Sequence, residues 1–231
     1  TAWEEPWGAG LGTGVQLVSG VGPNNNIQYS LPTVLGTTIK LAYSHDMGSA
    51  DTADKGASGS AGGTSGKGYD ATIKINPSLG TEILSGLNLY IGGHTAEHYV
   101  DGTPGNDRYQ AVGAITFDIG PLSLGYATSG IDTGNNTTVT DPAWYKNHFY
   151  GIAFNINDDL SVSYGKHDSQ QGLVNDGTKS TEDVEMDSFQ IAYTMGGASV
   201  RFADLSVDNA AYQADNQFDK EARVVSVSLA F

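Results

Sequence analysis

The sequence ends on ARVVSVSLAF, residues 222–231, and this stretch decides the fold class. Counting back from the last residue, every second side chain is apolar: Phe231, Leu229, Val227 and Val225. The residues between them are small or polar. Because successive Cβ atoms of an extended strand point to opposite sides, this alternation places all the apolar side chains on one face. The stretch therefore predicts a β-strand with one apolar and one polar face.

The same two-residue period recurs along the chain and predicts about eleven strands. The expected strands are residues 26–31, 37–45, 69–75, 87–95, 109–119, 122–128, 150–156, 160–164, 189–195, 200–202 and 222–231. On the second face of these strands, Ser, Thr, Gln, Gly and Ala outnumber Lys and Glu. Small polar residues of this kind are typical of a wall that lines water, and the wide aliphatic face then requires lipid.

Composition excludes several classes of protein. The chain has 231 residues, 11 basic and 26 acidic side chains, a net charge of −15 and no Cys. A nucleic-acid-binding protein is excluded because phosphate contact requires clustered Lys and Arg. No apolar run approaches the roughly 18 residues of a membrane-spanning helix, whereas a barrel strand needs only about 9–11 residues with every second one apolar.

The connections between the expected strands alternate in length. Residues 120–121, 157–159 and 196–197 are tight turns, and the long polar loops are residues 46–67, 129–146, 168–186 and 208–221. Aromatic residues follow the same division. Tyr43, Tyr69, Tyr109, Tyr126, Tyr150 and Tyr164 lie toward the long loops, and Phe117, Phe154 and Phe231 lie toward the turns. This arrangement predicts an all-β, antiparallel transmembrane barrel of the bacterial outer membrane, with two aromatic girdles.

Two stretches carry a resemblance to a family. NNNIQYSLPTVLGTTIKLAYS, residues 24–44, resembles the strand pair after the constriction loop of general bacterial porins. SFQIAYTMGGASVRFADLSVDN, residues 188–209, together with the C-terminal strand, is similar to the last three strands of alphaproteobacterial porins. The resemblance implies a single domain over residues 1–231, a C-terminal portion that holds about eleven strands of a sixteen-stranded barrel.

The resemblance also implies a function. A porin is a water-filled channel for passive diffusion of ions and small hydrophilic solutes, without enzymatic activity or a cofactor. It contacts outer-membrane lipid and is usually a homotrimer, for which outward residues such as Gly93 and Ala111 are expected at subunit contacts. Phe231, with Leu229 and Val227, resembles the signal that is read by the barrel-assembly machinery.

The first residues are assigned by the same resemblance. Residues 1–24 correspond to the pore-constricting loop, with Glu4 and Glu5 as its acidic face, and residues 25–231 supply the strands and their loops. An alternative is that GLGTGVQLVSG, residues 10–20, is itself a strand, which would make a complete twelve-stranded barrel.

The polar face supplies the expected pore lining. Its candidate residues are Lys40, Lys74, Asp70, Gln28, Asn88, Gln110, Asp118 and Arg201. The basic members, Lys40, Lys74 and Arg201, would face the acidic loop. Charges beside a water-filled pore bias which ions enter it.

Other functions have weaker signals. His167 and Ser169 have the His-x-Ser spacing of outer-membrane phospholipases, but His167 lies on the polar face, away from lipid. A secreted β-sandwich that binds a ligand would also have short strands and Gly-rich loops. The acidic loop residues Asp51, Asp54, Asp208, Asp215 and Asp219 could bind calcium, although no segment has the twelve-residue spacing of a calcium loop.

Overall fold

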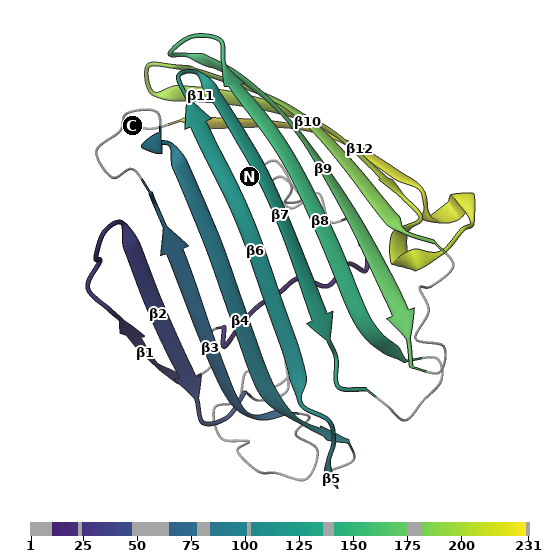
Figure 1. Cartoon of the computed structure of the whole chain (residues 1–231). Helices are drawn as coiled ribbons and strands as arrows, with labels where there is room; N and C mark the ends of the chain where they lie inside the picture. Colours follow the sequence, from purple (N-terminus) through teal and green to yellow (C-terminus); the bar gives the residue numbers. More distant parts are fainter. Residues whose placement is uncertain are drawn as a thin grey trace.

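The chain folds into one long antiparallel sheet (Figure 1). The computed structural model describes residues 11–22, 25–47, 65–77, 84–100, 103–135, 141–174 and 182–229. The strands are β1 (Asn26–Ser30), β2 (Thr37–Ser44), β3 (Ser65–Ile75), β4 (Leu87–Val100), β5 (Thr103–Pro104), β6 (Arg108–Ile119), β7 (Leu122–Asp132), β8 (Pro142–Asn155), β9 (Leu160–Leu173), β10 (Val184–Met195), β11 (Ala198–Asp208) and β12 (Lys220–Leu229). Two short 3₁₀ helices, η3 (Ala210–Tyr212) and η4 (Asn216–Phe218), lie between β11 and β12.

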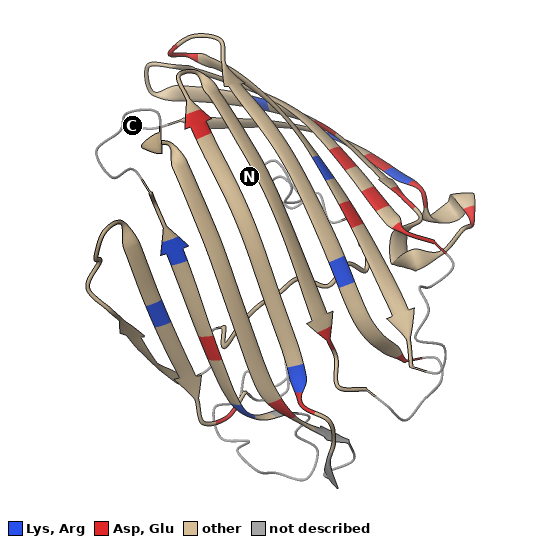
Figure 2. Cartoon of the chain, viewed as in Figure 1, with Lys and Arg blue, Asp and Glu red and all other residues tan. Residues whose placement is uncertain are grey.

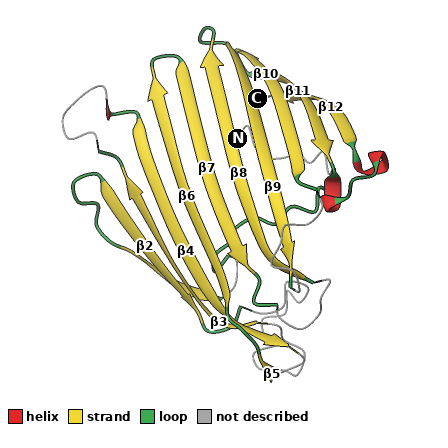
Figure 3. Cartoon of the chain, turned by 45° about the vertical axis from the view of Figure 1, so that its right-hand side comes forward, coloured by secondary structure: helices red, strands yellow, loops and turns green. Residues whose placement is uncertain are grey.

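Each strand pairs with the next one along the chain, apart from the two-residue β5, which pairs only with β4. The sheet is strongly curved, and its edges, β1 and β12, do not pair with each other (Figures 1 and 3). Within the described residues, no helix is long and apolar enough to cross a membrane. The predicted all-β, antiparallel architecture is confirmed, with eleven strands along the path of the sheet.

The two faces of the sheet have opposite polarity. We call the face in contact with residues 11–22 the inner face and the opposite face the outer face. Large apolar side chains are solvent-exposed on the outer face; Val225 and Val227, for example, are 67% and 63% exposed. Polar side chains such as Gln110 and Asn147 are buried on the inner face. In a soluble protein the apolar face of a sheet is usually the buried one, so the polarity here is inverted. Directly paired residues of antiparallel strands share a face, and the two-residue period therefore puts the apolar side chains of all strands on the same side of the sheet.

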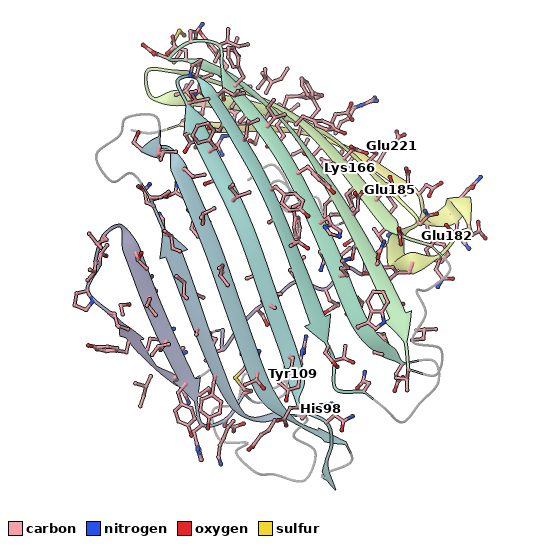
Figure 4. The ribbon with its side chains drawn as sticks, viewed as in Figure 1. His98, Tyr109, Lys166, Glu182, Glu185 and Glu221 are labelled. Atoms are coloured by element: carbon pink, nitrogen blue, oxygen red, sulfur yellow. The ribbon has the colours of Figure 1, made fainter. Side chains whose placement is uncertain are left out.

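The apolar part of the outer face is bounded by aromatic residues and then by charges. Tyr43 and Tyr69 have ring centroids 5.1 Å apart, and those of Tyr126 and Tyr150 are 5.2 Å apart. Beyond Tyr164 on β9, the outer face carries Lys166, whose Nζ lies 2.8 Å from a carboxylate oxygen of Glu185. Figures 2 and 4 show these charges gathered on β9–β12, while the centres of β4, β6 and β7 carry few. These strands therefore extend beyond the apolar band into a charged zone.

Two of the loops expected from the sequence are partly strand in the structure, because the strands continue into this charged zone. Residues 129–132 and 142–146, expected in one loop, belong to β7 and β8, and residues 168–173 and 184–186 belong to β9 and β10. These strands extend beyond the apolar band, so their outer side chains become polar and the hydrophobic alternation fades before the pairing ends. The short connections agree better with the expectation, since β6–β7 and β10–β11 turn through Gly120 and Gly196 with positive φ.

Candidate functional site: the inner segment and the polar wall

Residues 11–22, which we call the inner segment, cross the inner face without forming a strand (the purple trace in Figure 1). Gly12, Gly14, Gly20 and Gly22 have φ values of +59°, +76°, +61° and +61°. Those left-handed conformations are incompatible with a continuous β-strand. The alternative strand at residues 10–20 is therefore not formed by residues 11–20.

One end of the inner segment is held by the loop between β11 and β12. The Ala211 amide donates to the Thr13 carbonyl at 2.8 Å, and the Lys220 ammonium donates to the Leu11 carbonyl at 2.6 Å. Apolar packing reinforces these bonds. A cluster of Val184, Val207, Ala210 and Tyr212 packs against Leu11, Val15, Tyr145, Met186 and Phe218. The loop after β11 thus folds onto the inner face and fixes the start of the inner segment.

The middle and far end of the inner segment are held by polar side chains of the wall. The Asn147 amide on β8 donates to the Gln16 carbonyl at 3.0 Å. The Gln110 side-chain oxygen on β6 accepts from the amides of Ser19 and Gly20 at 2.9 and 3.2 Å. These bonds satisfy backbone groups that a strand ladder would otherwise pair.

The last hydrogen bond between the inner segment and the wall is on β3. An Asp70 carboxylate oxygen accepts from the Val21 amide at 2.9 Å, and Val21 is fully buried. Together with the Lys220 bond, this contact means that the inner segment connects the β12 side of the sheet to the β3 side. It therefore crosses the space that the curved sheet partly surrounds.

Tyr212 is the most deeply inserted aromatic side chain of this region, with 4% of its surface exposed. Its hydroxyl lies 2.8 Å from the Ser169 hydroxyl on β9, and its ring centroid lies 6.0 Å from that of Tyr145. Burial raises the pKa of Tyr212 to about 12, although the hydrogen bond with Ser169 acts in the opposite direction. The phenol is thus neutral at physiological pH.

The His-x-Ser pair is divided between separate partners. His167 stacks on Phe149 with ring centroids 4.1 Å apart, and its Nε2 lies 3.1 Å from the Asn147 side-chain oxygen. Ser169 is fully buried and bonds to Tyr212 instead. Both side chains are on the inner face. The pair has a structural role there, and it does not present a nucleophile to lipid on the outer face.

All eight expected pore-lining residues lie on the inner face by the register of the strands. Asp70 and Gln110 are in one cross-strand row, joined through His94, and both hold the inner segment. Lys74 lies on the same face, with its Nζ 5.5 Å from the ring centroid of Tyr90. Gln28 on β1 is in the same row as Asp70, through Ala42, and the remaining members, Lys40, Asn88, Asp118 and Arg201, lie in other rows on β2, β4, β6 and β11.

Glu4, Glu5 and Phe231 lie outside the described residues, whereas Leu229 and Val227 are exposed on the outer face of β12. Three further contacts of the inner segment, Asn147, Tyr212 and Lys220, are not among the residues expected from the sequence. Asn147 has inner-face parity with the expected strand 150–156 but lies between it and the expected loop 129–146, and nothing in the sequence indicates that Tyr212 folds inward.

Among the acidic loop residues that are described, Asp215 and Asp219 bond to amides of the loop itself, and Asp208 is the last residue of β11. Asp215 accepts from the Gln217 amide at 3.1 Å, and Asp219 accepts from the Asn209 amide at 3.0 Å. Among the described residues, no group of three or more His, Cys, Asp or Glu side chains could hold a metal ion. Asp51 and Asp54 lie outside that part of the chain.

Comparison with known proteins identifies the architecture. No protein-family model and no curated protein sequence matches this chain. Among solved structures, the outer membrane channel DcaP of Acinetobacter baumannii superposes on 88% of the chain with a TM-score of 0.56 and 11% sequence identity. The fold is that of an outer-membrane channel. The chain spans 60% of the length of that channel, and the similarity at this identity concerns the fold alone.

Proposed function

We propose that the protein is an outer-membrane porin, a water-filled channel for passive diffusion of ions and small hydrophilic solutes. The observation that carries the proposal is the inverted polarity of the sheet, with large apolar side chains exposed outside and polar side chains buried inside. An apolar outer surface of this extent is stable only in contact with lipid, and a polar inner wall is typical of a water-filled lumen. The fold shared with an outer membrane channel supports the same conclusion.

The bacterial outer membrane is the proposed location, and lipid contacts the apolar band on the outer face. The aromatic residues at the border of the band, such as Tyr43 and Tyr69, fit the interface between hydrocarbon and head groups. Phe231, Leu229 and Val227 remain the proposed signal for the barrel-assembly machinery.

Residues 1–24 are proposed as the constriction loop of this channel. The support comes from the inner segment, which crosses from β12 to β3 and is bonded to polar wall side chains along the way. A segment in this position narrows any lumen that the sheet encloses. Glu4 and Glu5 are proposed to place negative charge at the constriction, facing Lys40, Lys74 and Arg201 on the wall.

A homotrimer is proposed from the distribution of small residues on the outer face. Ala71, Gly93, Ala111 and Gly130 form one cross-strand row on β3, β4, β6 and β7. They lie in an open, predominantly apolar groove of about 1450 Å³ that also includes Tyr69 and Tyr109. Crosslinking in mild detergent is expected to give a trimer band, and crosslinking that stops at the monomer would contradict this assembly.

Bilayer recordings and liposome swelling test the channel itself. The protein is expected to produce stepwise, ohmic conductance in planar bilayers, and swelling rates in neutral sugars should fall smoothly with sugar size. A saturable interaction with one sugar and no conductance would favour a secreted binding protein. Release of fatty acid from the vesicles would favour a barrel phospholipase.

A further inference from the structure

Three nitrogen-rich side chains surround one small residue on the inner wall. His94 and His98 occupy inner-face positions of β4 on either side of Ala96, and Arg108 on β6 pairs directly with Ala96. Ala96 is 4% exposed, so neighbouring atoms cover it. Cross-strand neighbours and their diagonal neighbours lie within reach of long side chains, so the Arg108 side chain is flanked by both histidines. Figure 4 places His98 at the loop end of β4.

These side chains have buried polar atoms without partners. Both ring nitrogens of His94, Nδ1 of His98 and Nε of Arg108 are buried and make no hydrogen bond. Among the described residues, Arg108 has no ion pair, whereas Arg223, on the outer face, lies 3.3 Å from a carboxylate oxygen of Asp204. Buried donors are normally satisfied, and a partly buried charge without a counterion is unfavourable. These four nitrogens are closed to solvent, whereas the two terminal guanidinium nitrogens of Arg108 are not among them and can reach an acceptor in the adjoining space.

A cavity lies beside Arg108 and His98. Its volume is about 300 Å³, and it is lined by Gln16, His98, Arg108, Thr133, Asn135, Pro142 and Tyr145. At about 30 Å³ for each water molecule, this space holds roughly ten waters or one small organic solute. No Asp or Glu is among these lining residues. Asp70, the carboxylate paired through the register with His94, is already engaged by the Val21 amide.

The donors fit a carboxylate. The guanidinium group of Arg108 can present two parallel N–H groups to the two oxygens of one carboxylate. The hydroxyl of Tyr145 accepts a hydrogen bond from the Gln171 amide at 3.1 Å, which leaves its own O–H available to donate. The carbon chain of a solute could lie against Pro142 and the Tyr145 ring.

We infer that Arg108 and His98, which line this cavity, form a binding site for the carboxylate group of small organic anions that pass along the inner wall. This inference rests on the proposed channel function and adds a class of solute to it. It also differs from what the net charge of −15 suggests, because a local basic site can bind an anion within an acidic protein.

Gluconate and sorbitol are suitable probes, because they differ only in a carboxylate in place of a terminal hydroxymethyl group. In planar bilayers, gluconate is expected to reduce the chloride-salt conductance with saturation, and sorbitol is not. R108Q should raise the half-saturating gluconate concentration at least tenfold, and R108K should give an intermediate value because it keeps the charge but loses the paired donors. R223Q, at the outer-face ion pair, is the matched control and should behave like the wild type.

The outcomes separate this inference from the channel proposal. Absence of conductance in the wild type would refute the channel. Conductance without saturation by gluconate, or equal saturation in wild type and R108Q, would overturn the carboxylate site alone. If R108Q lowers sorbitol and gluconate permeation in liposomes by the same factor, Arg108 supports the wall and the binding site is also refuted.

Discussion

The hydroxyl groups of Ser169 and Tyr212 lie 2.8 Å apart in a buried site, although the two residues are 43 positions apart in the sequence. This contact joins the loop after β11 to the inner face of β9. In the same loop, the amide of Ala211, next to Tyr212, donates to the Thr13 carbonyl. The position of the inner segment therefore depends on how Tyr212 holds this loop.

Alkaline pH is expected to release this loop. The neutral phenol is favoured in the folded protein, because the pKa of Tyr212 is raised from 10.0 to about 12. The corresponding stability is therefore fully present below pH 10 and is lost as the pH rises through about 12. The rise amounts to about 3 kcal/mol on the scale of 1.36 kcal/mol for each pKa unit. Unfolding by denaturant at pH 8–12 should show this loss in the wild type and a smaller one in Y212F.

Absorbance at the tyrosinate band provides a direct check of the same residue. The difference between the titration curves of wild type and Y212F should have its midpoint near 12. A midpoint near the ordinary value of 10 would show that the ring is accessible to water.

Removal of Gln110 is expected to loosen the inner segment and raise permeation of larger sugars. Q110A leaves the partly exposed amides of Ser19 and Gly20 without their acceptor, and the loss of each hydrogen bond costs about 0.5–1.5 kcal/mol. Liposome swelling with sugars of increasing size measures the effect. Q28A, in the same cross-strand row, is the control, and equal swelling in both variants would show that the inner segment does not limit passage.

A charge in the apolar band should reduce stability in lipid. I152R places a cation on the exposed outer face of β8, where the bilayer penalty for Arg is roughly 2–4 kcal/mol at the membrane centre. S206R, on the outer face of β11 opposite Asp187 and Glu221, should have little effect. Denaturant unfolding in lipid vesicles compares the two. Equal stability would argue that β8 does not face hydrocarbon.

The turn between β1 and β2 is expected to tolerate no side chain at Gly36. Its φ is +73°, and an added Cβ would lie 2.0 Å from the Asn76 carbonyl oxygen, so G36A requires the backbone to move. G120A has a similar φ of +56° but meets no atom within 4 Å. G120A should cost about 1–2 kcal/mol from left-handed strain alone, and G36A should cost more. Similar unfolding free energies for the two variants would contradict the steric argument.

Neutralising the N-terminal acids should lower the proposed cation preference. E4Q combined with E5Q removes two negative charges from the proposed constriction, and charges in a narrow pore bias ion entry. Reversal potentials in a salt gradient should shift toward those of an unselective pore. Unchanged potentials would remove these residues from the constriction.

The sequence was sufficient for the strands and their two faces, because alternation reports directly on which side chains share a face. Tyr164, Lys166 and Asp168 show where this signal fails. All three are on the outer face of one strand, but the change from aromatic to charged residues looks like the start of a loop. Alternating apolar residues mark only the part of a strand that contacts lipid, whereas the hydrogen-bonded pairing of the strands continues beyond that part.

The candidate site was predictable only in part. Asp70 and Gln110 could be placed on the inner face by parity, but their role as acceptors for the inner segment depends on contacts between residues 49 and 91 positions apart. Arg108 lies at the first position of β6, just outside the expected strand, so its parity was not assigned. Long-range contacts of this kind leave no local periodic signal.

The inner segment also limits the width of the sheet. It is tied near Leu11 to Lys220 and at Val21 to Asp70. At about 3.3–3.6 Å for each extended residue, the stretch from Leu11 to Val21 spans at most roughly 35 Å. The two attachment points cannot move further apart than this length allows while both bonds hold. The contour length of one short peptide therefore sets an upper limit on the span between β12 and β3, and the number of residues in it is a quantity on which selection for pore size could act.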